Sequence, residues 1–135
     1  MSPTLVALVG FATWTALLVF GLAGLRAAYA QRTGKVLNSF LPDGSDLEGL
    51  TQRWTRVHLN CLEFLPVAAA VGLAAVVAGK AAITDPLAMP LLYLRVGQSL
   101  VHLISTSVPF VMIRATLFVG QILIVLYWSY SLLTG

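Results

Sequence analysis

Four long apolar stretches, separated by shorter polar segments, make up most of this chain. They run from about residue 5 to 29, 55 to 78, 87 to 105 and 110 to 133. A helix needs about 20 residues to cross the roughly 30 Å of hydrocarbon in a bilayer, and each stretch has about that length. Backbone N–H and C=O groups in lipid must find partners within the chain, so each stretch is predicted to be helical. The expected fold is an all-α integral membrane protein, a four-transmembrane-helix bundle.

Composition supports this fold class. Of the 135 residues, 59% are hydrophobic and only 10% are charged, too few to cover the surface of a soluble domain. We expect a single domain over residues 1–135. No basic cluster is interleaved with aromatic residues, so nucleic acid is not an expected partner. Cys61 is the only cysteine, which excludes an intrachain disulfide and a cysteine-based metal site, and we expect no metal.

The basic residues predict how the helices are oriented. Most of them flank the long polar connection between the first two spans, about residues 31–52: Arg26, Arg32, Lys35, Arg53 and Arg56. Arg114 follows the short third connection, and only Lys80 lies on the second. Because lysine and arginine concentrate in cytoplasmic loops, the first and third connections are predicted to be cytoplasmic and both termini to lie outside.

A polar motif stands at the start of the second span. Arg56, Asn60 and Glu63 follow one another at spacings of four and three residues. On a helix these side chains fall within roughly 60° of one another, because each residue turns about 100°. Polar and charged groups at membrane depth are costly, and they usually face a cavity or a partner. We therefore expect a functional site here.

The third span carries a second polar face. Arg95 and His102 lie seven residues apart, with Gln98 between them, and so share one side of the helix. An unpaired arginine at this depth is costly, and Glu63 is the one acid within a span that could pair with it. An interhelical Arg95–Glu63 ion pair is predicted, either as part of a site or as a structural clip without a chemical role.

Positive charge is in surplus near the same membrane face. Arg56 and Arg114 lie at helix ends beside asparagine and glutamine. Arginine binds carboxylates through two parallel hydrogen bonds, so this set of groups suits an anionic ligand that carries carboxylates. The cations of the first connection are also explained by topology and by contact with anionic lipid.

The stretch from Arg56 to Glu63, followed by Pro66, resembles the Arg-x-x-x-Asn-x-x-Glu signature of the MAPEG superfamily (membrane-associated proteins in eicosanoid and glutathione metabolism). The four spans, the long first connection, Arg95 and Arg114 match the layout of that family over nearly the whole chain. The similarity is to its short bacterial-type members, which implies an integral protein of the bacterial inner membrane.

The resemblance implies a homotrimer that binds glutathione, as co-substrate, between subunits near the cytoplasmic face. The implied glutathione-binding residues are Arg56, Asn60, Glu63, Arg95, Gln98 and His102. Arg114 is the implied catalytic residue, because a cation beside sulfur lowers the thiol pKa and raises the reactive fraction. The implied activity is that of a glutathione transferase or peroxidase acting on a lipophilic electrophile or hydroperoxide from the bilayer.

Two positions depart from the pattern of the catalytic members. His102 stands where they often have a tyrosine, and Ala115, after Arg114, offers no hydroxyl. Two other functions therefore stay open. One is a non-catalytic trimeric membrane protein that keeps its charged groups for assembly. The other is a small proton-coupled exporter using Glu63, although a Glu63 held by Arg95 would stay ionised and carry protons poorly.

Overall fold

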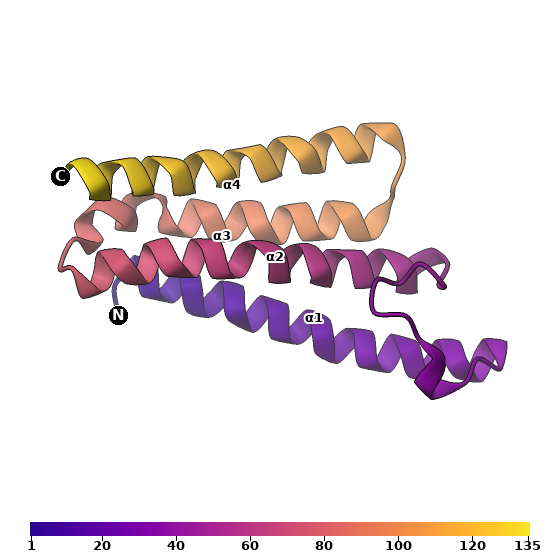
Figure 1. Ribbon diagram of the computed structural model, residues 1–135. Helices are drawn as coiled ribbons and strands as arrows, with labels where there is room; N and C mark the ends of the chain where they lie inside the picture. The colour runs from indigo at the N-terminus through magenta and orange to yellow at the C-terminus, as the bar shows by residue number, and fades with distance from the viewer.

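The computed structural model describes all 135 residues, and its regular structure is entirely helical (Figure 1). Four long helices follow one another: α1 (Pro3–Thr33), α2 (Gly49–Val77), α3 (Ala81–Ile104) and α4 (Val108–Thr134). A short 3₁₀ helix, η1 (Leu37–Ser39), lies in the connection between α1 and α2. Each of the four long helices is long and apolar enough to cross a membrane. The prediction of an all-α bundle of four such helices is confirmed.

Local sequence explains where α1 begins and ends and where α4 begins. The Ser2 hydroxyl accepts the backbone N–H of Leu5, and Pro3 occupies the first turn of α1, where its missing N–H costs nothing. Gly34 ends α1 in the left-handed conformation, with a φ of 76°. Pro109 occupies the first turn of α4 for the same reason as Pro3.

Helix α3 begins at Ala81, six residues before the predicted start of the third span, and contains both Pro86 and Pro90. Each proline removes one backbone hydrogen bond from the helix. Contacts between α1 and residues 81–86, the part of α3 that was not predicted, offset the loss of these hydrogen bonds. The Asp85 carboxylate accepts both the backbone N–H of Thr4, at 3.0 Å, and its hydroxyl, at 2.6 Å. The segment therefore anchors the start of α1 instead of forming a loop.

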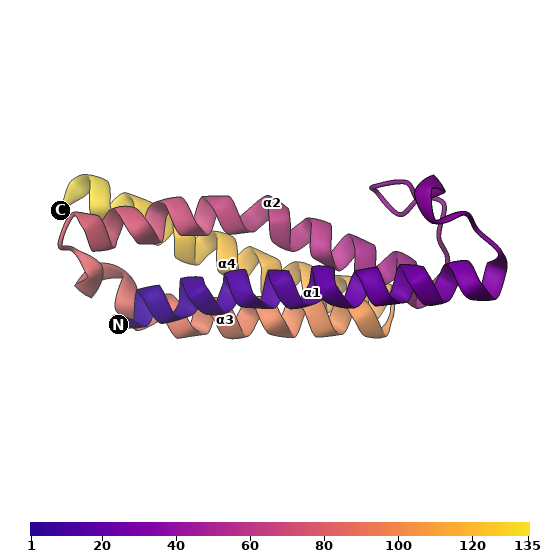
Figure 2. The ribbon, with the colours of Figure 1, turned by 90° about the horizontal axis from the view of Figure 1, so that it is seen from below.

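The helices pack in an order that leaves α4 at the edge. Helix α1 packs against α2 and α3, and α4 packs mainly against α3, with a smaller contact to α2 and none to α1 (Figures 1 and 2). The core between the helices includes Phe11, Cys61, Phe64, Leu91 and Trp128. Much of the apolar surface of α4 therefore faces outward.

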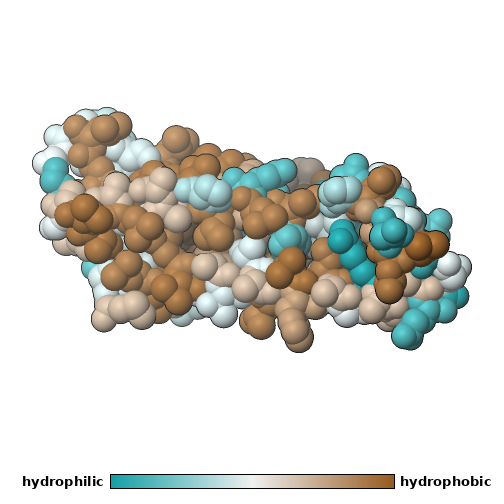
Figure 3. Space-filling model, turned by 60° about the horizontal axis from the view of Figure 1, so that its bottom comes forward, coloured by the Kyte–Doolittle hydropathy of each residue, from teal (hydrophilic) through white to brown (hydrophobic).

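The two ends of the bundle differ in polarity. Both termini lie at one end, and the α1–α2 and α3–α4 connections lie at the other, which we call the loop end (Figure 1). On the face shown in Figure 3, hydrophilic side chains gather toward the loop end and apolar ones cover most of the remainder. An apolar exterior with a polar end is what a membrane-embedded bundle requires.

Candidate functional site

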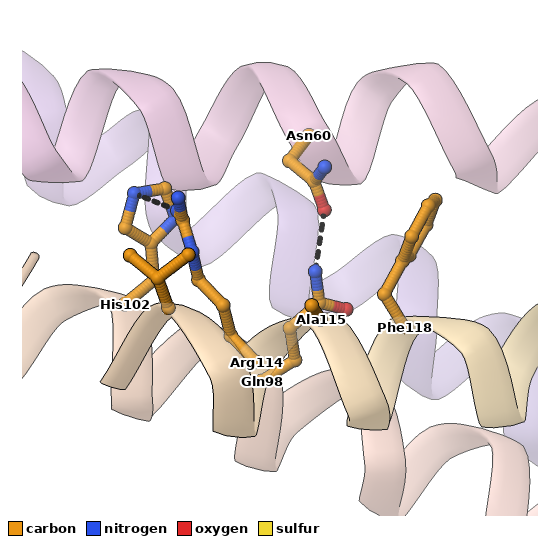
Figure 4. A pocket seen from close by; sticks show the side chains of 7 residues that line it. Asn60, Gln98, His102, Arg114, Ala115 and Phe118 are labelled. Carbon is orange, nitrogen blue, oxygen red and sulfur yellow. Dashed lines mark hydrogen bonds between the residues drawn. The ribbon is translucent and has the colours of Figure 1, made fainter. Parts of the chain in front are cut away.

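Polar side chains of three helices meet in two adjoining cavities near the loop end. The first cavity, of about 230 Å³, lies between α2, α3 and α4 (Figure 4). Its walls are formed by Asn60, Gln98, His102, Val111, Arg114, Ala115 and Phe118. The second cavity, of about 370 Å³, lies along α2 and the α1–α2 connection. Its walls are formed by Asp43, Ser45, Arg56, Leu59, Asn60, Glu63 and His102.

Six of the seven predicted site residues line one or both of these cavities. Gln98 and Arg114 line the first, Arg56 and Glu63 line the second, and Asn60 and His102 line both. The structure therefore brings together polar residues that lie up to 58 positions apart, from Arg56 to Arg114. We call this pair of cavities the loop-end site.

Arg95 is the predicted site residue that lines neither cavity. It is only 1% exposed, and its Nη1 donates to Asn60 Oδ1 at 2.6 Å. Its guanidinium carbon lies 5.1 Å from the ring centroids of Phe11 and Phe64 and 5.7 Å from that of Phe118. Ring faces attract a cation, most strongly where water is excluded. Nη1 also lies 4.0 Å from Cys61 Sγ, so three aromatic rings, one amide oxygen and one sulfur surround the charge of Arg95.

The predicted Arg95–Glu63 ion pair is wrong. The ion pair within the chain joins Lys35 to Asp46, and Glu63 is exposed in the second cavity. Asn60, Cys61 and Phe64 are the α2 side chains that contact Arg95. Glu63 precedes Phe64 by one residue, so its side chain leaves the helix about 100° away. Helical spacing placed Asn60 and Glu63 on one broad face of α2. Arg95 contacts the Asn60 side of that face and not the Glu63 side.

A chain of side-chain amides extends the Arg95 contact across the bundle. Gln98 Nε2 donates to Asn60 Oδ1 at 3.0 Å, and Gln121 Nε2 donates to Gln98 Oε1 at 2.8 Å. Gln121, fully buried on α4, was missed by the sequence reasoning. A signal was present, because Gln121 lies seven residues after Arg114 in an apolar span and so on the same helix face.

Arg114 and His102 form a hydrogen bond across the turn between α3 and α4 (Figure 4). Arginine can only donate, so His102 Nε2 accepts, and a neutral ring then carries its proton on Nδ1. On α4, Val111, Ala115 and Phe118 form an apolar wall beside this pair. The first cavity thus joins cationic and amide groups to an apolar surface.

The α1–α2 connection closes one side of the second cavity. Asp43 accepts hydrogen bonds from the Ser45 backbone N–H, at 3.0 Å, and the Ser45 hydroxyl, at 2.8 Å, which lower the pKa of the Asp43 carboxyl. Lys35 contacts Asp46 at 2.9 Å and lowers the pKa of that carboxyl, which also accepts the Leu41 N–H. The sequence reasoning missed Asp43 and Ser45, because loop spacing does not show how a connection folds over a helix.

Four helices able to cross a membrane, with arginine, histidine and amide side chains gathered at one end, define a small integral membrane protein with a polar site within the bundle. Residues 4–134 match the MAPEG family, and the chain belongs to this family. No curated protein and no solved structure matches the chain. The resemblance found in the sequence is therefore confirmed over nearly the whole chain.

Proposed function

We propose that this protein binds glutathione in the loop-end site and transfers it to a lipophilic electrophile, or uses it to reduce a lipophilic hydroperoxide. MAPEG membership provides the prior expectation, since the family includes glutathione transferases. The observation that carries the proposal is the first cavity. Its Arg114–His102 pair suits an anionic, sulfur-bearing ligand, and its apolar α4 wall suits a substrate that comes from lipid.

The charged groups of the site match those of glutathione, which has two carboxylates, one ammonium group and a thiol. Arg56 in the second cavity supplies a guanidinium group for a carboxylate. Glu63, exposed in the same cavity without an ion-pair partner in its own chain, supplies a carboxylate for the ammonium group. Asn60, Gln98 and His102 supply hydrogen bonds between these groups and Arg114.

Arg114 is the proposed catalytic residue. A guanidinium group beside the sulfur favours the thiolate, and the thiol proton leaves to water. In conjugation, the thiolate electron pair forms a carbon–sulfur bond, and the electrophile releases its leaving group or takes up a proton. In reduction, the thiolate attacks a peroxide oxygen and the oxygen–oxygen bond breaks, releasing an alcohol. A second glutathione then converts the sulfenic acid to a disulfide and water.

We also propose a homotrimer in the bacterial inner membrane, with the loop end in the cytoplasm. The outward-facing apolar surface of α4 and the accessible position of both cavities support a site that neighbouring subunits complete. Most of the basic residues flank the connections at the loop end, which supports the cytoplasmic assignment. The mass of the detergent-solubilised particle, measured by native mass spectrometry, tests the trimer.

The contacts of Glu63 and Arg95 also bear on the two alternative functions, a proton-coupled exporter and a non-catalytic trimer. The argument that pairing with Arg95 prevents proton transport by Glu63 no longer holds, because that pair is not formed. Glu63 stands at the midpoint of α2, in a cavity that Arg56 also lines, so the exporter alternative stands beside the proposal. In the non-catalytic alternative, charged groups join the subunits. Arg95 cannot serve in this way, because its partners lie within its own protomer.

The first experiment compares the heat stability of the purified protein with and without millimolar glutathione, using a non-thiol anionic tripeptide as control. A ligand at about 100 times its dissociation constant adds roughly 2.7 kcal/mol of stability, enough for a clear shift. A shift specific to glutathione supports the proposal. No shift with either peptide contradicts it and favours the non-catalytic alternative.

The second experiment measures conjugation to a lipophilic electrophile. Arg114→Ala should lower kcat by about 10²-fold or more, because a positioned charge that stabilises the reacting anion is lost. Arg114→Lys should recover part of this loss. The matched control is Arg32→Ala, an exposed arginine at the end of α1, which should leave turnover unchanged. Equal turnover in Arg114→Ala and the control would exclude Arg114 as the catalytic residue.

A further inference from the structure

Arg95 fixes which groups donate and which accept in the hydrogen bonds that link Asn60, Gln98 and Gln121. A guanidinium group donates and cannot accept, so the Asn60 atom that lies 2.6 Å from Arg95 Nη1 is the oxygen Oδ1. The Gln98 amide that also contacts Oδ1, at 3.0 Å, must then present its nitrogen. Its oxygen faces Gln121, which donates through Nε2 at 2.8 Å. One arginine therefore sets the orientation of three amides.

The consequence for the loop-end site lies at Asn60. Its oxygen already accepts two hydrogen bonds, from Arg95 and Gln98 of α3, and points toward the Gln98 amide (Figure 4). Its Nδ2 group makes no hydrogen bond within the chain, and Asn60 lines both cavities. A ligand therefore meets two N–H donors at Asn60 and no acceptor.

Burial makes this orientation hard to reverse. Arg95 and Gln121 line neither cavity and are 1% and 0% exposed, so water cannot replace a lost partner at either residue. Rotating the Asn60 amide by 180° would place its N–H groups against the N–H groups of Arg95 and Gln98 and leave buried donors unpaired. An unpaired buried polar group costs about 1–3 kcal/mol, and more when it is charged.

We propose that Asn60 is an obligate hydrogen-bond donor that selects a carboxylate over a carboxamide on the ligand, and that Arg95 and Gln121 are positioning residues. Neither Arg95 nor Gln121 lines a cavity, so each acts on the ligand through Asn60 or Gln98. Arg95 is thereby reassigned from a ligand-binding residue to one that orients Asn60. The choice of probes below rests on the proposed glutathione function.

The test is the Asn60→Asp variant, which keeps the oxygen that Arg95 and Gln98 contact and replaces the outward-facing donor by an acceptor. Affinity is measured by titration calorimetry for glutathione and for its two monocarboxamides. Wild type should bind glutathione about tenfold or more tightly than one of the two amides. Asn60→Asp should bind glutathione at least about tenfold more weakly and lose or reverse that preference. Unchanged affinity and preference in Asn60→Asp would overturn the proposal.

Gln121→Met tests the far end of the amide chain. Methionine fills a similar volume but cannot donate to Gln98 Oε1. We expect a several-fold smaller preference for the carboxylate, because Gln98 and Asn60 are less firmly oriented. Ile122→Met, at the neighbouring and partly buried position of α4, is the matched control and should keep the wild-type preference. Equal preferences in Gln121→Met and the control would exclude Gln121 as a positioning residue.

A ligand-free measurement separates this inference from the proposed function. Asn60→Leu leaves Arg95 without its oxygen acceptor and should lower the melting temperature by several degrees, whereas Asn60→Asp should keep or raise it. If wild type binds none of the peptides, the proposed function fails, and this order of melting temperatures still tests the orientation of Asn60. Asn60→Asp melting as low as Asn60→Leu would overturn the orientation itself.

Discussion

At the scale of single residues, Arg95 shows that a buried charge in a bundle need not be neutralised by an acid. Its partners are the Asn60 amide oxygen, the Cys61 sulfur and the faces of Phe11, Phe64 and Phe118. Glu63 was the expected partner, because a buried charge is usually paired with an opposite charge. Aromatic faces at this distance also attract a cation, and the sequence does not show that three of them converge on one point.

Removing the Arg95 side chain should destabilise the bundle. Arg95→Ala should cost about 2–5 kcal/mol, because it leaves a cavity between three aromatic rings, and Arg95→Met, which refills the cavity, should cost less. Arg56→Ala, at an exposed site on α2, should change stability by less than about 0.5 kcal/mol. Equilibrium unfolding in mixed detergent micelles measures all three. Equal losses for Arg95→Ala and Arg56→Ala would contradict the packing described here.

At the scale of helices, α1 and α2 are joined through Trp54. Its indole Nε1 donates to the backbone oxygen of Leu18 at 2.7 Å, and its ring lies over Gly21. A Cβ atom at Gly21 would lie 2.5 Å from the Trp54 ring, whereas a Cβ atom at Gly24 would meet nothing within 4 Å. Small residues permit close packing of membrane helices, and of these two glycines only Gly21 lies at such a contact within this chain.

The two glycines provide a matched test of the α1–α2 contact. Gly21→Ala should destabilise the bundle by about 1–3 kcal/mol, because the rigid indole must move and its hydrogen bond to Leu18 lengthens. Gly24→Ala should be neutral or stabilise by up to about 1 kcal/mol, the helix propensity that alanine gains over glycine. Thermal unfolding followed by circular dichroism compares them. A stable Gly21→Ala and a destabilised Gly24→Ala would show that another contact, between subunits, dominates on this face of α1.

At the scale of the whole molecule, the arrangement of the ends makes orientation testable. Both termini lie at the end of the bundle opposite the loop end (Figure 1). Once the membrane side of one terminus is known, the membrane side of every connection follows. Lys80 is the one basic residue on the connection at the terminal end. The difference in lysine and arginine between the two ends predicts a cytoplasmic loop end.

Labelling of an introduced cysteine checks this orientation. Cys61 is 0% exposed, so the unmodified chain should give little background with a membrane-impermeant maleimide. In sealed right-side-out vesicles, Thr134→Cys at the terminal end should react at once. Thr106→Cys at the loop end should react only after the vesicles are permeabilised. The reverse order would place the loop end, and with it the proposed glutathione site, outside the cytoplasm.

Sequence alone determined the four helices and the family, and six of the seven residues that it predicted for the site line the loop-end cavities. These follow from the length of the apolar stretches and from helical spacing, which are local properties of the chain. Tertiary structure decided the partners: Asn60 rather than Glu63 for Arg95, Gln121 at the end of the amide chain, and Asp43 beside the second cavity. These contacts join different helices or a loop to a helix, and they depend on helix rotation and loop path, which helical periodicity fixes only to within tens of degrees.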